Sequence, residues 1–137
     1  MVLDPSVALS WYFRDEESEP LLAIQAMADS HQLVVPPHWF AEVANGIRQG
    51  ERRGRSDPGD VPRFLEFLGE LEFSIDTLKP FAQVELILPL AREYTLTVYD
   101  AAYLHCALSK RLPLAAFDGP LSRAARRADV AVIDGRS

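Results

Sequence analysis

Short runs of apolar residues alternate along this chain with longer stretches in which apolar residues recur at helical spacing. The apolar runs predict strands at residues 1–3, 33–35, 73–78, 114–117 and 130–133. The stretches between them predict helices that begin near Pro5 and then cover residues 20–30, 39–53, 61–72, 81–94, 99–111 and 121–128. Strands separated by helices pair in parallel, and a parallel sheet needs helices on both faces. The pattern therefore predicts an α/β fold, a three-layer sandwich around a mostly parallel sheet of about five strands.

Length and charge limit the organisation and the partners of this protein. One domain is expected over residues 1–137, because the loop-like stretch at residues 54–59 is too short for a domain linker. The net charge of -6 excludes attraction of the whole molecule to nucleic acid or to an anionic membrane. No apolar run approaches the roughly 18 residues of a membrane span, and a single cysteine, Cys106, fits a reducing compartment. We therefore expect a cytoplasmic protein with no membrane partner, in which any polyanion is bound locally.

Four acidic residues stand at or near the start of predicted helices. Asp4 and Asp118 each follow a predicted strand, and Asp100 lies in the first turn of the sixth predicted helix. Taken singly, each aspartate fits an ordinary capping role, since acids favour helix N-termini. Glu42 lies inside the third predicted helix, where the ordinary alternative is a solvated side chain paired with an arginine.

The predicted topology gives these acids a common location. In a parallel sheet the carboxyl ends of the strands share one edge, and ligands bind beyond that edge. Asp4, Asp100 and Asp118 all fall there. Glu42 lies on a helix that starts from the same edge. Carboxylates within about 5 Å repel by about 3 kcal/mol per pair, so such a cluster either protonates or binds cations. All-oxygen ligands favour a hard cation, so we expect the four acids to converge and to bind Mg2+ or Mn2+.

Other polar residues receive structural interpretations. His31, His38 and His105 show no metal-ligand spacing and are interpreted as structural or surface residues. Asp76 also ends a predicted strand, but residues 77–80 separate it from the next helix, so we exclude it from the site.

Arginine is the dominant base, with twelve arginines against two lysines. Two arginine clusters lie on helices that follow acidic positions, and their members are Arg48, Arg52, Arg53, Arg123, Arg126 and Arg127. Two interpretations stay open: solvated helical faces, or two flanks that bind phosphates of RNA on either side of a metal centre.

Four segments in order resemble the PIN-domain ribonucleases, specifically toxins of the VapC type from bacterial toxin-antitoxin pairs. The segments are residues 2–11, 35–45, 96–104 and 112–118, and together they span almost the whole chain. The resemblance implies a PIN-like sandwich. It also implies a catalytic and metal-binding quartet of Asp4, Glu42, Asp100 and Asp118, supported by Ser6 and Asn45.

The activity implied by the resemblance is Mg2+- or Mn2+-dependent hydrolysis of RNA phosphodiester bonds. It further implies a homodimer and inhibition by a cognate VapB-type antitoxin, whose C-terminal segment covers the site. The homodimer is also indicated by the apolar content of the predicted helices at residues 20–27 and 61–71. In the second of these, Phe64, Phe67 and Leu68 together exceed a narrow core stripe and predict an apolar surface. Ala116 and Phe117 stand where family members carry Thr or Ser. A PIN-like domain that binds RNA or a partner without cutting therefore stays open as the alternative.

Overall fold

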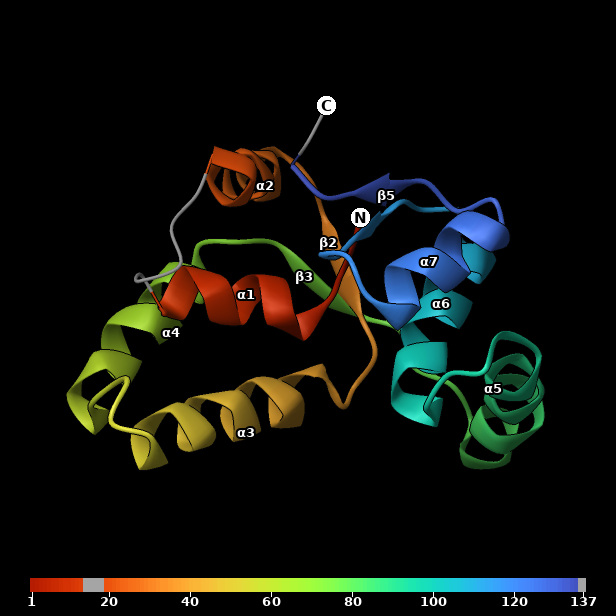
Figure 1. Ribbon diagram of the computed structural model, residues 1–137, viewed down its shortest axis with the longest axis horizontal. Helices are drawn as coiled ribbons and strands as arrows, with labels where there is room; N and C mark the ends of the chain where they lie inside the picture. Colours follow the sequence, from red (N-terminus) through yellow and green to blue (C-terminus); the bar gives the residue numbers. More distant parts are fainter. Residues whose placement is uncertain (14–18, 136–137) are drawn as a thin grey trace.

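A computed structural model describes residues 1–13 and 19–135 (Figure 1). In these residues the strands are β1 (Val2–Leu3), β2 (Leu33–Val35), β3 (Phe73–Ile75), β4 (Leu114–Ala115) and β5 (Val132–Ile133). The helices are α1 (Pro5–Tyr12), α2 (Glu19–Ser30), α3 (Trp39–Arg52), the 3-10 helix η2 (Pro58–Asp60), α4 (Val61–Gly69), α5 (Pro80–Tyr94), α6 (Val98–Lys110) and α7 (Pro120–Arg127). All strand pairs are parallel, in the order β3-β2-β1-β4-β5. The predicted α/β fold is confirmed.

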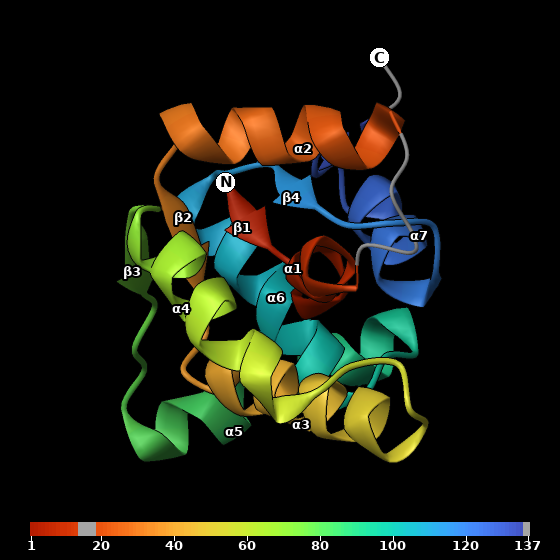
Figure 2. The ribbon, with the colours of Figure 1, turned by 90° about the vertical axis from the view of Figure 1, so that its left-hand side faces the viewer.

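The helices form two layers with the sheet between them. Figures 1 and 2 show α1, α2 and α4 on one side of the sheet and α5, α6 and α7 on the other. Helix α3 passes beneath α1, and the N-terminal ends of α1, α3 and α6 meet below the carboxyl edge of the sheet in Figure 1. Among the described residues, no helix is both long enough and apolar enough to cross a membrane.

Two strands end earlier than the sequence predicts. Strand β3 stops at Ile75, and the Asp76 N–H makes its last bond to β2, at the carbonyl of Val35 (2.8 Å). Strand β4 stops at Ala115, and the N–H of Ala116 bonds to the carbonyl of Ile133, the last residue of β5 (3.1 Å). In each case the neighbouring strand has ended, so the residues beyond have no partner for a ladder. The apolar pattern continues past the point where pairing stops.

Helix α3 is fixed by packing at both of its ends. The Trp39 side chain at its start is 1% exposed, and its ring lies 5.0 Å from that of Phe73 on β3. Further along, α1 lies so close that a Cβ atom on Gly50 would collide with the ring of Phe13, and one on Gly46 with the side chain of Leu9. Glycine at these two positions allows α1 and α3 to approach each other.

Three apolar residues of α4, Phe64, Phe67 and Leu68, pack against the core of the same chain. Phe64 is 6% exposed, and its ring lies 5.0 Å from that of Tyr12. Phe67 packs edge-on against Trp11 at 5.8 Å, and Leu68 also packs against the core. The prediction of an exposed surface is wrong for Phe64, which α1 covers, whereas Phe67 and Leu68 are half-buried against the same core.

Candidate active site

Asp4 is positioned by the central strand. Its N–H bonds to the carbonyl of Ala115 on β4 (3.0 Å), and its carboxylate caps α1 by accepting bonds from the Ser6 N–H (3.3 Å) and the Ser6 hydroxyl. Burial raises the pKa of Asp4 to about 6, helped by the negative charges of Asp100 and Glu42 and opposed by the bonds from Ser6. Asp4 therefore both caps α1 and lies among other acids, with a raised pKa.

Asp100 lies in the first turn of α6. The Asp100 N–H donates to Oγ1 of Thr97 (3.1 Å), which caps this helix and fixes where its first turn lies. Burial raises the pKa of Asp100, and the nearby His38 ring opposes the rise. Its environment is therefore that of a half-buried acid with a basic neighbour.

Glu42 lies on the first turn of α3 and reaches across to α6. The Tyr103 hydroxyl donates a hydrogen bond to Oε1 of Glu42 (2.8 Å), and Nε2 of His38 lies 3.3 Å from the same oxygen. Burial, followed by the charge of Glu42 and its hydrogen bond, raises the pKa of Tyr103, and Asp4 and Asp100 add to the rise. Tyr103 therefore stands among all three acids.

These observations bring Asp4, Glu42 and Asp100 together, and we call these three residues the acidic cluster. The fourth predicted acid has a different environment. The Asp118 side chain is 79% exposed and pairs with Arg123, with an N–O distance of 3.4 Å. Asp118 follows β4 at the predicted edge, but its described partner is this arginine.

Two residues of the site are absent from the sequence-based set. The sequence indicates only a structural or surface role for His38 and assigns no role to Tyr103. Their spacing carried a signal: His38 lies four residues before Glu42, and Tyr103 lies three residues after Asp100. Residues at these spacings share a helix face. Many residues have neighbours at such spacings. Only the fold, in which α3 faces α6, shows which of them contact the acidic cluster.

The supporting residues and the arginines fall into separate environments. Ser6 contacts Asp4, whereas the side chain of Asn45 is exposed and makes no hydrogen bond to any described residue. Four arginines have partners within the chain: Arg48 pairs with Glu51, Arg123 with Asp118, Arg126 with Asp134, and Arg127 bonds to the carbonyl of Tyr94. Arg52 and Arg53 are exposed at the end of α3 and pair with no other described residue.

The described contacts of Asp76 are with residues outside the acidic cluster. Its carboxylate is nearly buried and lies 3.8 Å from Nζ of Lys110. Burial raises the pKa of Cys106 to about 12, and the charge and hydrogen bond of Asp76 add to the rise. The described partners of Asp76 therefore lie along α6, away from the turn that carries Asp100.

The acidic cluster fits a hydrated divalent ion better than a closed metal cage. In the part of the chain that the structure describes, no three His, Cys, Asp or Glu side chains form a ready-made metal centre. Mg2+ is normally bound through only one or two carboxylates and keeps several waters. The donors are all oxygens, and the charges of Asp100 and Glu42 add to the rise that burial causes in the pKa of Asp4, so a cation would offset repulsion among the three acids.

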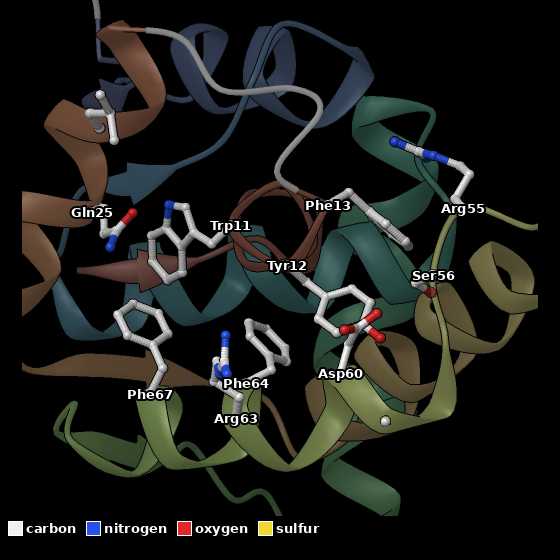
Figure 3. Close-up of a pocket in the computed structure, with 12 residues that line it drawn as sticks. Trp11, Tyr12, Phe13, Gln25, Arg55, Ser56, Asp60, Arg63, Phe64 and Phe67 are labelled. Atoms are coloured by element: carbon white, nitrogen blue, oxygen red, sulfur yellow. The ribbon is translucent and has the colours of Figure 1, made fainter.

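A separate hollow of about 770 Å3 lies between α1, α2 and α4 (Figure 3). Figure 3 shows Trp11, Phe64 and Phe67 on its walls and Arg63 at its side. Indole Nε1 of Trp11 and the hydroxyl of Tyr12 are buried and have no hydrogen-bond partner in the described structure. This aromatic hollow is distinct from the acidic cluster.

Fold and site together define a class: a parallel α/β domain with acids gathered where α1, α3 and α6 begin. The chain belongs to the PIN domain family, which it matches over residues 1–127. Members of this family are typically nucleases and generally bind divalent metal ions.

A solved structure shows the same fold. The chain is similar to the crystal structure of PAE2754 from Pyrobaculum aerophilum, with a TM-score of 0.68 and 21% sequence identity. The similarity covers 96% of this chain and 87% of that chain. A comparison with curated protein sequences finds no match.

Proposed function

We propose that this PIN domain, spanning residues 1–137, is a Mg2+- or Mn2+-dependent endoribonuclease of the VapC type. The observation that carries the proposal is that Asp4, Glu42 and Asp100 come together from three separate elements. Burial raises the pKa of Asp4, and the charges of Asp100 and Glu42 add to the rise. Membership of a family of nucleases supports the same reaction class.

The acidic cluster and its neighbours have distinct roles in this proposal. Asp4, Glu42 and Asp100 would surround the hydrated ion, and Asp118 would join them from the end of β4 once its contact with Arg123 opens. A bound Mg2+ or Mn2+ supplies Lewis acidity and an activated water. Ser6 orients Asp4, and Asn45, one turn after Glu42 on α3, supports the site from its exposed side.

Metal withdrawal tests the activity. The purified chain, incubated with total RNA, is expected to cut in Mg2+ or Mn2+, to stop in EDTA, and to cut again when the metal is restored. RNA that stays intact in both metals while still binding the protein would favour the non-cleaving domain. The alternative has one specific support: Ala116 and Phe117 offer no hydroxyl beside Asp118, and Asp118 is exposed.

Of the arginines, Arg52 and Arg53 are the best placed to bind RNA phosphates. Arg52 lies ten residues beyond Glu42 on the same helix, about 15 Å from it along the axis, and Arg53 follows directly as the C-cap. We expect Arg52→Ala with Arg53→Ala to weaken RNA binding across sequences and to lower the salt slope by about one unit per lost phosphate contact. Filter binding at several salt concentrations measures both.

Two controls accompany the arginine prediction. Arg111→Ala removes an exposed charge at the other end of α6 from Asp100 and should leave the salt slope unchanged. Binding of Mn2+ should be the same in all variants, because none of these arginines contacts the acidic cluster. An unchanged RNA affinity in the double variant would show that these arginines only solvate the helix.

The homodimer is proposed through a different surface from the one that the sequence indicated. Exposed apolar side chains stand at the junction of β3, α5 and α6, where Val84, Val98 and Tyr99 line a hollow of about 360 Å3. Phe81, 82% exposed, stands one turn before Val84. An exposed apolar patch of this kind is typical of a protein interface.

Light scattering tests this surface. The protein is expected to be a dimer at micromolar concentration, and Phe81→Lys is expected to make it a monomer. Leu65→Lys, on the exposed face of α4, should leave the dimer intact. A monomeric wild-type chain, or a dimer that only Leu65→Lys disrupts, would contradict the assignment.

An antitoxin of the VapB type is the proposed partner, because the resemblance to VapC toxins implies one. The aromatic hollow between α1, α2 and α4 offers an apolar surface for such a segment, and the acidic cluster offers a site for a basic side chain. Co-expression with the neighbouring open reading frame, followed by co-purification, tests this partner.

A further inference from the structure

His38 and Tyr103 both lie against the same oxygen of Glu42. The Tyr103 hydroxyl donates to Oε1 at 2.8 Å, and Nε2 of His38 lies 3.3 Å from Oε1. Tyr103 is 0% exposed and belongs to α6, whereas His38 immediately precedes α3. Neither contact caps a helix. Both contacts instead fix the orientation of the Glu42 carboxylate.

We infer that Tyr103 and His38 are positioning residues that occupy Oε1 of Glu42 and so leave its other oxygen, Oε2, to face a divalent cation. The inference rests on the proposed metal site and adds residues outside the acidic quartet. It assigns a role to two side chains that contact the acid but carry no metal themselves.

The donor and acceptor roles follow from the neighbours of each group. A phenol both donates and accepts, and a carboxylate only accepts, so the proton of this bond comes from Tyr103. Nε2 of His38 also lies 3.4 Å from the carbonyl oxygen of Tyr99. Both neighbours of this nitrogen are acceptors, so Nε2 carries the hydrogen.

The two contacts also tie the helices that carry the acids. Tyr103 reaches from α6 to Glu42 on α3, and His38 reaches from the start of α3 to the Tyr99 carbonyl on α6. The ring of His38 packs edge-on against both Tyr99 (5.6 Å) and Tyr103 (5.3 Å). The relative placement of Glu42 and Asp100 therefore depends on this pair, as well as on the fold.

Partners that orient a metal ligand typically change metal affinity by about 10- to 100-fold. Tyr103→Phe removes only the hydroxyl and is expected to weaken Mn2+ binding within that range, measured by isothermal titration calorimetry on the full chain. Tyr12→Phe is the matched control, because the Tyr12 hydroxyl is buried without a partner in the described structure. It should bind Mn2+ like the wild type.

A double-mutant cycle separates positioning from general packing. Glu42→Gln alone should weaken Mn2+ binding, and adding Tyr103→Phe to it should weaken binding no further, because the phenol acts through the carboxylate. Independent, additive losses would overturn the inference. So would a Tyr103→Phe protein that melts at a lower temperature but binds Mn2+ like the wild type, since that is a packing effect.

A second variant decides the matter if Tyr103→Phe does not fold. His38→Ala, at a partly exposed position, is expected to fold and to weaken Mn2+ binding; unchanged binding would overturn the inference. If Glu42→Gln itself binds Mn2+ like the wild type, the proposed metal site fails and this inference fails with it. Loss in Glu42→Gln together with wild-type binding in both Tyr103→Phe and His38→Ala would overturn the positioning role alone.

Discussion

Asp4→Asn is expected to lower RNA cleavage in Mg2+ by at least about a thousandfold, which corresponds to about 4 kcal/mol of transition-state stabilisation. Asp4 lies near both other members of the acidic cluster, whose charges add to the rise that burial causes in its pKa. Asparagine keeps an oxygen that accepts from the Ser6 N–H, so α1 keeps its cap. The variant should therefore fold normally, with the loss confined to metal binding and cleavage.

Substitutions of two other aspartates serve as controls for this loss of cleavage. Asp29→Asn changes an exposed residue of α2 and should cleave like the wild type. Asp118→Asn should have a smaller effect than Asp4→Asn, because the Asp118 side chain is largely exposed and already paired with Arg123. Single-turnover cleavage of one purified RNA measures all three. Equal activity of Asp4→Asn and the wild type would remove Asp4 from the catalytic group.

The metal-free protein is expected to lose about 3 kcal/mol of stability from Asp4 as the pH rises from about 4 to about 7. The folded pKa of about 6 lies above the ordinary value of 3.8. The folded state therefore binds this proton more tightly than the unfolded state does. The contribution of Asp4 is present below pH 4 and is lost as the pH rises through 6. The difference between the two pKa values, at about 1.36 kcal/mol per pH unit, gives the magnitude.

A comparison of two unfolding curves isolates this effect from the other carboxylates. Urea unfolding in EDTA should show Asp4→Asn becoming more stable than the wild type as the pH rises between 4 and 7. Saturating Mg2+ should shrink the difference, because the ion offsets the charge that asparagine removes. Curves that stay parallel across this range would show that Asp4 ionises normally in the folded protein.

The alternation of strands and helices was sufficient to predict the sheet, because each buried strand is a short apolar run with a helix on either side. Strand ends were harder to predict. Residues 76–78 continue the pattern of β3, but the ladder stops where β2 ends. The role of the apolar face of α4 was also hard to predict. Periodicity shows that one face of a helix is apolar, but it does not show what covers that face. Phe64 and Phe67 are covered by Tyr12 and Trp11 of the same chain.

The site was predictable where it follows from sheet topology. Asp4 and Asp100 stand at the starts of helices on the carboxyl edge, and those positions can be read from one sequence. Tyr103 and His38 act across the gap between α3 and α6, and spacing along the chain carries no information about which helices face each other. The environment of Asp118 likewise depends on Arg123, five residues further along the chain.

The close approach of α1 and α3 means that two glycines outside the acidic cluster affect the distance between two of its acids. Asp4 caps α1 and Glu42 lies on α3, and the separation of these helices depends on Gly46 and Gly50 lacking side chains. A methyl group at Gly50 would collide with the ring of Phe13, so either the ring or the two helices must shift to admit it. Evolution can therefore adjust the distance between two acids of the cluster by volume changes in the core, with every charged residue retained.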